Sequence, residues 1–285
     1  MVYINYFSAY IAYQEKILLL SLTRRISPKA VEIVQTPCPA AQAARSPYLA
    51  PTASTFLSPD AHGLAPPHGD TTLRREALLR SALLERFPGT IALVSSFGAE
   101  SAVLLHMVAA IDRATPVIFI DTGKLFPETL RYRDRLARRL GLADLRVARP
   151  DPGRLARSDP AGTLWQSDPD LCCWHRKVEP LDAALEGFKA WITGRKRLHG
   201  GARTALPAIE TGPDGRIKVN PLADWTEQDV ADYFLTHDLP PHPLTAAGYR
   251  SIGCAPCTRA VRPGEAPRAG RWAGRDKTEC GIHSR

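Results

Sequence analysis

The stretch TIALVSSFGAESAVLLHMVAAI (residues 90–111) joins a short apolar run, a turn rich in serine and glycine, and a second apolar run. This pattern predicts a buried strand that leads directly into a helix. The helix start offers free N–H groups and the positive end of its dipole, which favour an anion. The small or hydroxyl-bearing residues of the turn are Ser95, Ser96, Gly98 and Ser101. We therefore expect an anion site at this strand end, although a tight turn without any ligand has the same pattern.

The turn differs from two common phosphate-binding loops. It has neither the Gly-x-Gly-x-x-Gly spacing of dinucleotide sites nor the Gly-Lys-Ser/Thr ending of a P-loop. A second candidate loop, DTGKLFPET (residues 121–129), begins where the next predicted strand ends. Ligands of open α/β sheets collect at the carboxyl ends of the strands. Both loops are therefore expected at one edge of a sheet.

Strands and helices alternate on either side of these loops. The predicted strands are 90–96, 116–121, 145–149 and 190–194. The predicted helices are one that starts near Asp70, then 100–111, 127–141, 171–185 and 226–237. Such alternation is typical of a doubly wound, mostly parallel α/β sheet. Two short runs, AIETG and RIKVNPL, are expected to pair as an edge hairpin across Pro213, Asp214 and Gly215.

The chain divides into three parts by composition. Residues 1–68 are rich in proline and alanine without a sustained period, so we expect a disordered N-terminal extension; an organelle transit peptide is a less favoured alternative. Residues 69–240 form the predicted α/β domain, and residues 241–285 a loop-rich C-terminal segment. The N-terminus has no membrane-spanning run and no cleavage site, which predicts a cytoplasmic protein with no membrane partner. No role is predicted for Cys38.

Positive charge is concentrated near the C-terminus. The formal net charge is +8, and residues 250–285 hold eight Lys or Arg against three acids. Such an excess fits either nucleic acid or a small phosphorylated or sulfated anion. The basic residues are not interleaved with aromatic ones, as they are in nucleic-acid grooves, so the small anion is favoured and no nucleic-acid partner is expected.

Four cysteines form the most specific motif. Cys172 and Cys173 are adjacent, and Cys254 and Cys257 form a Cys-x-x-Cys. In a reducing compartment, clustered cysteines are more often metal ligands than disulfides. Four thiolates suit zinc or an iron–sulfur cluster. Adjacent cysteines reach one zinc ion only with difficulty, whereas a cluster has separate irons; a 4Fe-4S cluster is therefore favoured, and zinc or a vicinal disulfide remains an alternative.

Cys280 remains outside this set of four. It lies in KTECGIH (residues 277–283), close to Arg275, Lys277 and His283. Positive neighbours favour the thiolate, which is the nucleophilic form of cysteine. Cys280 is thus a candidate nucleophile, although an inert cysteine near the C-terminus would look the same by spacing alone.

Together these motifs resemble the adenylyl-sulfate and phosphoadenylyl-sulfate reductase family, of the assimilatory bacterial type. The resemblance runs from about residue 70 to residue 285 and rests on SSFGAES, DTGKLFPET, CCWHRKVEPL, WITGRKR, IGCAPCT, RAGRWAG and ECGIH. It implies a nucleotide-binding domain of the PP-loop (adenine nucleotide alpha-hydrolase) type. It also implies a 4Fe-4S cluster bound by Cys172, Cys173, Cys254 and Cys257, and adenosine 5′-phosphosulfate (APS) as substrate.

The resemblance further implies a thiol-dependent reduction in assimilatory sulfate reduction and cysteine biosynthesis. Cys280 would attack the sulfur of APS, AMP would leave, and thioredoxin or glutaredoxin would release sulfite. Lys177 would lie between cluster and substrate, and Arg268 and Arg271 would hold the phosphosulfate. His283 and Arg197 are further substrate-binding candidates. RKRLHG (residues 195–200) departs from the usual Leu-Arg-Arg-Asp/Glu-Gln-Ser, which puts the contacts of Arg197 in doubt.

Three other functions compete with this one. The chain could use the 3′-phosphorylated nucleotide, or both nucleotides. It could be an iron–sulfur or zinc regulator that binds nucleic acid, in which case Cys280 would be dispensable. An ATP pyrophosphatase on the same fold would be expected to start its loop with Ser-Gly-Gly, which is missing here. The chain ends two residues after His283, so we expect a separate dithiol donor, and a homo-oligomer is compatible with the sequence.

Overall fold

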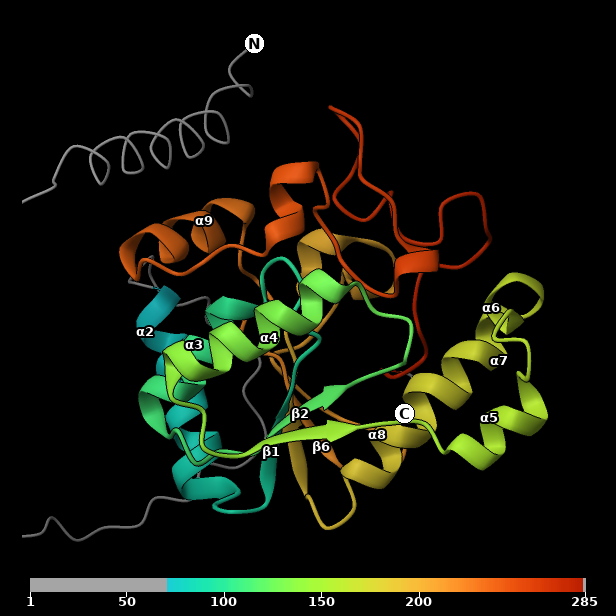
Figure 1. The fold of residues 1–285 in the computed structure, drawn as a ribbon. Coiled ribbons are helices and arrows are strands. Elements are labelled where there is room, and N and C mark those ends of the chain that lie inside the picture. The colour runs from blue at the N-terminus through green and yellow to red at the C-terminus, as the bar shows by residue number, and fades with distance from the viewer. Residues whose placement is uncertain (1–70, 284–285) are drawn as a thin grey trace, which may run out of the picture. The chain divides into compact units, whose positions relative to one another are not determined.

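The computed structural model describes residues 71–283, and its centre is a six-stranded sheet of order β3-β2-β1-β4-β6-β5 (Figure 1). Only the edge pair of β5 and β6 is antiparallel. The strands are β1 Ile91–Val94, β2 Val117–Ile120, β3 Leu145–Ala148, β4 Ala190–Ile192, β5 Ile209–Thr211 and β6 Ile217–Val219. The predicted doubly wound, mostly parallel α/β sheet and its edge hairpin are confirmed.

Helices cover both faces of the sheet, as the alternation of side chains along β1 requires. Ile91 and Leu93 point into a large apolar core with the helices α2, α3, α4 and α9, whereas Ala92 points into a smaller one with α8. These helices are α2 Thr71–Arg80, α3 Ser101–Ile111, α4 Pro127–Leu140, α8 Glu179–Ala184 and α9 Glu227–Thr236. The central strands β1, β2 and β4 are therefore buried on both faces, which explains their continuous apolar sequences, whereas the edge strands β3 and β5 are partly exposed.

Local chemistry fixes where two of the helices begin and end. α4 ends at Gly141, whose φ of 64° is easily adopted only by a residue without Cβ. α9 begins after Thr226, which accepts a hydrogen bond from the Asp229 N–H while Asp229 accepts one from the Thr226 N–H. This reciprocal pair is a capping box. The predicted helix ends at Gly141 and Thr226 are confirmed.

The helix expected over residues 171–185 is divided into three consecutive helical segments. α7 Pro169–Cys173 is followed by a π-helical turn, η2 Trp174–Val178, and then by α8. Pro180 has no N–H, so it cannot continue the hydrogen-bond ladder across this point, and the wider turn accommodates the break. Two short helices were not predicted, α5 Pro152–Ser158 and α6 Leu164–Ser167.

The C-terminal segment contains little regular structure, as predicted. Between α9 and residue 283 the helical elements are two short 3₁₀ turns, η5 Pro243–Ala247 and η6 Ala255–Cys257. Isolated bridges join Leu125 to Cys254 and Thr258 to Arg271. Two further 3₁₀ turns, η3 Arg197–His199 and η4 Gly201–Arg203, follow β4. Within the described residues no helix has both the length and the apolarity to cross a membrane. Asp70, Cys38 and the predicted extension 1–68 lie outside the described residues.

Candidate active site

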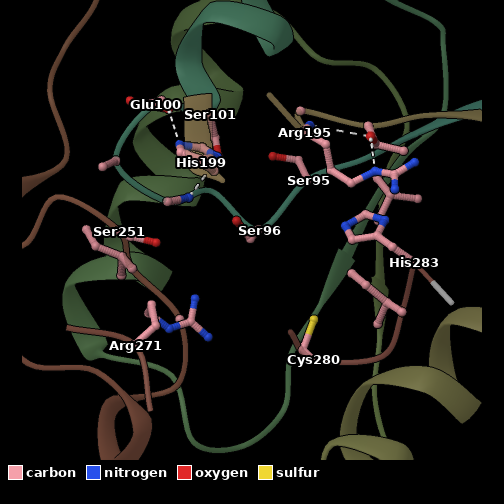
Figure 2. A pocket seen from close by; sticks show the side chains of 18 of the residues that line it. Ser95, Ser96, Glu100, Ser101, Arg195, His199, Ser251, Arg271, Cys280 and His283 are labelled. Atoms are coloured by element: carbon pink, nitrogen blue, oxygen red, sulfur yellow. Dashed lines mark hydrogen bonds and ion pairs between the residues drawn. The ribbon is translucent and has the colours of Figure 1, made fainter. Parts of the chain in front are cut away.

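A pocket of about 230 Å³ lies beyond the carboxyl ends of β1, β2 and β4. Its wall combines the loop after β1, the turns after β4 and the C-terminal segment. Figure 2 shows Ser95, Ser96 and Arg195 on the sheet side, with Arg271 and Cys280 contributed by the C-terminal segment. Polar groups from regions far apart in sequence therefore converge at the place where open α/β sheets bind ligands.

The serine and glycine loop after β1 is held in shape from within. The Phe97 N–H donates to Ser95 Oγ at 3.2 Å, and the Gly98 N–H donates to Ser101 Oγ at 2.9 Å. Phe97 has a φ of 49°, and its fully buried ring packs edge-on against Phe119 at 5.5 Å. A Cβ at residue 98 would lie only 3.3 Å from the carbonyl oxygen of Ile252. The pocket wall includes all four predicted loop residues, Ser95, Ser96, Gly98 and Ser101.

Five basic residues that the motifs did not single out also line the pocket: Arg195, Lys196, His199, Arg203 and Arg250. Lys196 is only 2% exposed and donates to Glu100 at 2.6 Å. Arg197, the predicted residue of this run, does not line the pocket, because its Nε donates to the Leu206 carbonyl at 2.7 Å. The basic run after β4 was the available signal. Which of its side chains face the pocket depends on the backbone turns η3 and η4.

The C-terminal segment brings the remaining predicted residues to the same pocket. Its wall includes Lys177, Arg268, Arg271, Cys280 and His283. Figure 2 shows the Cys280 sulfur and the Arg271 guanidinium both directed into the pocket. Within the described residues, neither Lys177 nor Arg271 forms an ion pair with a carboxylate, so both charges are available to an anionic ligand.

The Arg271 guanidinium is closely packed between Trp272 and the backbone of Gly253. Its guanidinium carbon lies 4.2 Å from the centre of the Trp272 ring, and its buried Nε has no hydrogen-bond partner in the described part of the chain. A Cβ at Gly253 would come within 2.4 Å of Nη2, so a side chain at residue 253 would displace the guanidinium from this position. Packing between a ring and bare backbone holds the guanidinium in one orientation. Its orphaned donor marks a place where a ligand oxygen would be stabilised.

His283 anchors the end of the described chain. Its ring stacks on Trp191 with centres 5.5 Å apart and planes at 3°. Burial, helped by the nearby charge of Arg195, lowers the pKa of His283 well below its usual value. The imidazole is therefore neutral at pH 7, and its Nδ1 has no hydrogen-bond partner within residues 71–283.

The four cysteines of the predicted cluster line one small second cavity beside the pocket, together with Arg176, Lys177 and Trp272. Cys172 and Cys173 come from α7, Cys254 directly precedes η6, and Cys257 is the last residue of η6. Burial raises the pKa of Cys172 and Cys257, and that of Cys173 to about 11. Such thiols lose their protons on binding a metal. In the described residues, no three His, Cys, Asp or Glu side chains are grouped closely enough to hold a metal ion as they stand.

Lys177 lines both cavities and so lies between the cysteines and the pocket. Burial opposes its charge, but the nearby sulfurs of Cys254, Cys280 and Cys173 outweigh that effect and raise the pKa of Lys177 above its usual value. A buried ammonium with a raised pKa is a permanent positive charge at neutral pH. It faces the four-cysteine cavity on one side and Cys280 on the other.

Fold and pocket together define an α/β protein with a basic pocket beside a free cysteine. Residues 90–260 match the family described as "Phosphoadenosine phosphosulfate reductase domain", and the chain belongs to this family. The predicted family and enzyme class, a sulfonucleotide reductase, are thereby confirmed.

Relatives and a solved structure agree with the family. The "Adenosine 5'-phosphosulfate reductase" of Mesorhizobium japonicum is 57% identical over 208 residues, 73% of this chain and 81% of the relative. That of Chelativorans sp. is 54% identical over 213 residues, 74% and 86% of the two chains. The crystal structure of phosphoadenylyl-sulfate (PAPS) reductase from Candida auris, a phosphate complex, is 30% identical with a TM-score of 0.56, and covers 67% of this chain and 93% of that one.

Proposed function

We propose that the chain reduces APS to sulfite and AMP through an S-sulfocysteine on Cys280. The observation that carries this proposal is the position of Cys280 in a pocket whose other walls bear basic side chains and the serine loop. The loop and the start of α3 would receive the nucleotide phosphate, because N–H groups and a helix N-terminus favour anions. Arg271 and Lys177 would face the sulfate end.

The reaction would proceed in two balanced steps. The Cys280 thiolate forms an S–S bond to the sulfur of APS, the bond from that sulfur to the phosphate oxygen breaks, and AMP leaves with the electron pair. A dithiol protein then attacks Cys280 Sγ, and sulfite leaves with the electron pair of the S–S bond. The second thiol of the donor resolves the mixed disulfide, so the donor is oxidised by two electrons. We assign thioredoxin or glutaredoxin to this role.

The positive charge of the pocket would lower the barrier of the first step. An anionic nucleophile approaches an anionic sulfonyl group, so repulsion must be compensated by fixed cations in a partly dehydrated site. Arg271 can offer paired N–H donors to sulfate oxygens, and Arg268 can add a second guanidinium. The neutral His283 would contribute a single hydrogen bond rather than charge.

Cys172, Cys173, Cys254 and Cys257 would hold a 4Fe-4S cluster. Their fit is supported by the shared cavity, by four soft donors from two segments, and by the positive charge of Lys177 at its wall, where Arg176 is already paired with Asp159. Bound there, the cluster would join η6 to α7 and set the local charge beside Lys177. We assign it no electron-transfer step, because the dithiol donor supplies both electrons.

The remaining predictions are proposals of the same kind. The nucleotide would bind to residues 69–240, and residues 241–285 would supply Cys-x-x-Cys and the nucleophile. The reaction would belong to assimilatory sulfate reduction and cysteine biosynthesis in the cytoplasm. A 3′-phosphorylated substrate is the alternative, supported by the likeness to the Candida auris enzyme.

Trapping with sulfur-labelled nucleotide tests the proposal. Anaerobically purified protein mixed with labelled APS, then denatured and digested, is expected to carry the label on the Cys280 peptide. Cys280→Ser should lose the label and all sulfite formation but keep the iron–sulfur absorbance, whereas Cys172→Ala should lose the absorbance. Cys38→Ser is the matched control and should behave as wild type. A label elsewhere, or stronger labelling from the 3′-phosphorylated nucleotide, would overturn the proposed site or the proposed substrate respectively.

A further inference from the structure

The residue before the proposed nucleophile makes the most extensive ion pair of the pocket. Arg203 Nε donates to Glu279 Oε1 at 2.6 Å, and Arg203 Nη2 donates to Glu279 Oε2 at 2.7 Å. Two parallel bonds fix both the distance and the plane of a carboxylate, unlike a single contact. The two residues are 76 positions apart in sequence, so the pair joins the turn η4 to the C-terminal segment.

Arg203 is itself held in place. Its Nη1 lies 3.3 Å from Nδ1 of His199. Burial, followed by the charge of Lys196, lowers the pKa of His199 to about 4, so the ring is neutral at pH 7 and its Nδ1 can accept this bond. Side-chain freedom that is already lost in the scaffold does not have to be lost again when the C-terminal segment docks. Arg203 is therefore a preset receptor for Glu279.

Cys280 lies between two sets of anchors. On its N-terminal side, Arg268 donates to the Thr278 carbonyl at 2.7 Å, and the same Nη2 lies 3.6 Å from Glu279 Oε2, so Arg268 adds a weaker second ion pair to the carboxylate that Arg203 holds. On its C-terminal side, Ile282 packs against the smaller apolar core, and the His283 carbonyl accepts a bond from Lys218 at 3.0 Å. With both flanks attached, the Cys280 side chain has a short, fixed span of backbone from which to reach the pocket.

We propose that Arg203 and Glu279 form a positioning clamp, which aims Cys280 at the sulfur of the substrate without touching the substrate. This inference deepens the proposed function and rests on it. The clamp also neutralises Arg203, so that the unpaired Lys177 and Arg271 mark where the anion binds. A displacement of about 1 Å at a reacting atom costs up to about 100-fold in rate, which sets the size of the expected effect.

The test is Glu279→Gln in the full chain with its cluster. One carboxylate oxygen becomes an amide donor that cannot accept from Arg203, so only half of the clamp can form. The single-turnover rate of Cys280 labelling by APS is expected to fall about 10- to 100-fold. Affinity for APS should stay within about threefold, because ground-state contacts are kept. Iron–sulfur absorbance and the rate of sulfite release from preformed adduct should be unchanged.

A second readout does not depend on the proposed reaction. Without nucleotide, iodoacetamide should alkylate Cys280 faster in Glu279→Gln than in wild type, because the half-buried thiol gains freedom. Glu279→Asp, which keeps the charge but shortens the side chain, should lie between the two and serves if the first variant folds poorly. Glu265→Gln is the matched control, because Glu265 pairs with Arg259 through two bonds in the same segment but at its surface.

The outcomes separate the clamp from the proposed function. Labelling of Glu279→Gln at the wild-type rate, or a loss of APS affinity as large as the loss of rate, would refute the clamp. Unchanged alkylation of Cys280 would refute it as well. A wild-type protein that never acquires label on Cys280 would instead refute the proposed reaction. The alkylation rate of Cys280 would still test the clamp, because that measurement does not use APS.

Discussion

The sheet with its helices (residues 71–240) and the C-terminal segment (residues 241–283) both reach the pocket, but different forces order them. The first contains nearly all of the buried apolar side chains, including every residue of the strand β4. The second contributes few, such as Ile252 and Trp272, and is held by backbone bridges and ion pairs. Lys277 pairs with Asp170, and the Arg275 side chain donates to the Trp165 carbonyl.

Because different interactions order the two regions, folding stability and the proposed chemistry depend on different parts of the chain. A buried apolar side chain contributes about 2 to 5 kcal/mol when cut to alanine. Partly exposed ion pairs contribute about 1 kcal/mol or less. The first region can therefore carry the folding free energy while the second places basic groups, thiols and the nucleophile. Variants in the two regions are expected to change different measurements.

Among variants that keep Cys280, the largest effect of this difference is expected on catalysis and comes from Arg271→Ala. Hydrogen bonds to charged groups contribute about 1.5 to 3 kcal/mol, so kcat/KM for APS should fall up to about 100-fold. The free energy of unfolding should stay level or rise, because a half-buried cation without a carboxylate partner and with an unpaired Nε is costly to fold. Steady-state sulfite formation and urea denaturation measure the two quantities.

Arg262→Ala is the matched control for Arg271→Ala. Arg262 lies in the same segment but is exposed, and it does not line the pocket. It should change neither kcat/KM nor stability. If Arg271→Ala instead lost stability in proportion to its loss of activity, the separation of the two regions would fail.

The part of the site that lies on the sheet could be predicted because its signals are local. The serine loop follows from a strand, a turn and a helix that are consecutive in sequence, and all four of its predicted residues line the pocket. The ends of α4 and α9 follow from Gly141 and Thr226, which act within one turn of their own helix. Periodicity and capping act over a few residues, so one sequence is enough to detect them.

The remaining part depends on contacts that local patterns do not encode. Arg203 and Glu279 meet only because η4 and the C-terminal segment come together in space, and no periodicity links them. Lys196 and Arg197 are neighbours, yet one faces Glu100 in the pocket and the other donates to Leu206 outside it. The direction of a side chain in an irregular turn depends on backbone angles that composition does not reveal.

The second largest effect is expected at His242, where the C-terminal segment is joined to α4. This fully buried ring lies 3.1 Å from Thr129 Oγ1, and its Nδ1 accepts from the Leu244 N–H at 3.1 Å. Burial lowers the pKa of His242 to about 4 in the folded protein, from 6.5. Between these values the unfolded chain binds the proton more readily, so stability falls as pH falls. The stability that neutral His242 contributes is fully present above pH 6.5 and decreases below it, and about 2 kcal/mol of it is lost at pH 5.

His242→Gln isolates that contribution from other buried histidines. The variant should be less stable than wild type at pH 7, because the joint is weakened. Its free energy of unfolding should nevertheless fall less between pH 7 and pH 5, by about 2 kcal/mol. Urea denaturation at the two pH values measures both. Parallel pH dependence in the two proteins would show that His242 is protonated in the folded state, contrary to its burial.

The smallest effect tests the region built from the sheet and its helices. Thr226→Ala removes one side of the capping box of α9, and loss of a cap costs about 1 kcal/mol of stability. Neither kcat/KM nor the iron–sulfur absorbance should change, because Thr226 does not line the pocket. Gln228→Ala is the control in the same helical turn, since its bond to Asp232 lies on the surface and should contribute a few tenths of a kcal/mol. A fall in kcat/KM for Thr226→Ala with unchanged stability would mean that α9 acts on the site directly. The proposed division, in which the sheet and its helices supply stability and the C-terminal segment supplies the chemistry, would then be wrong.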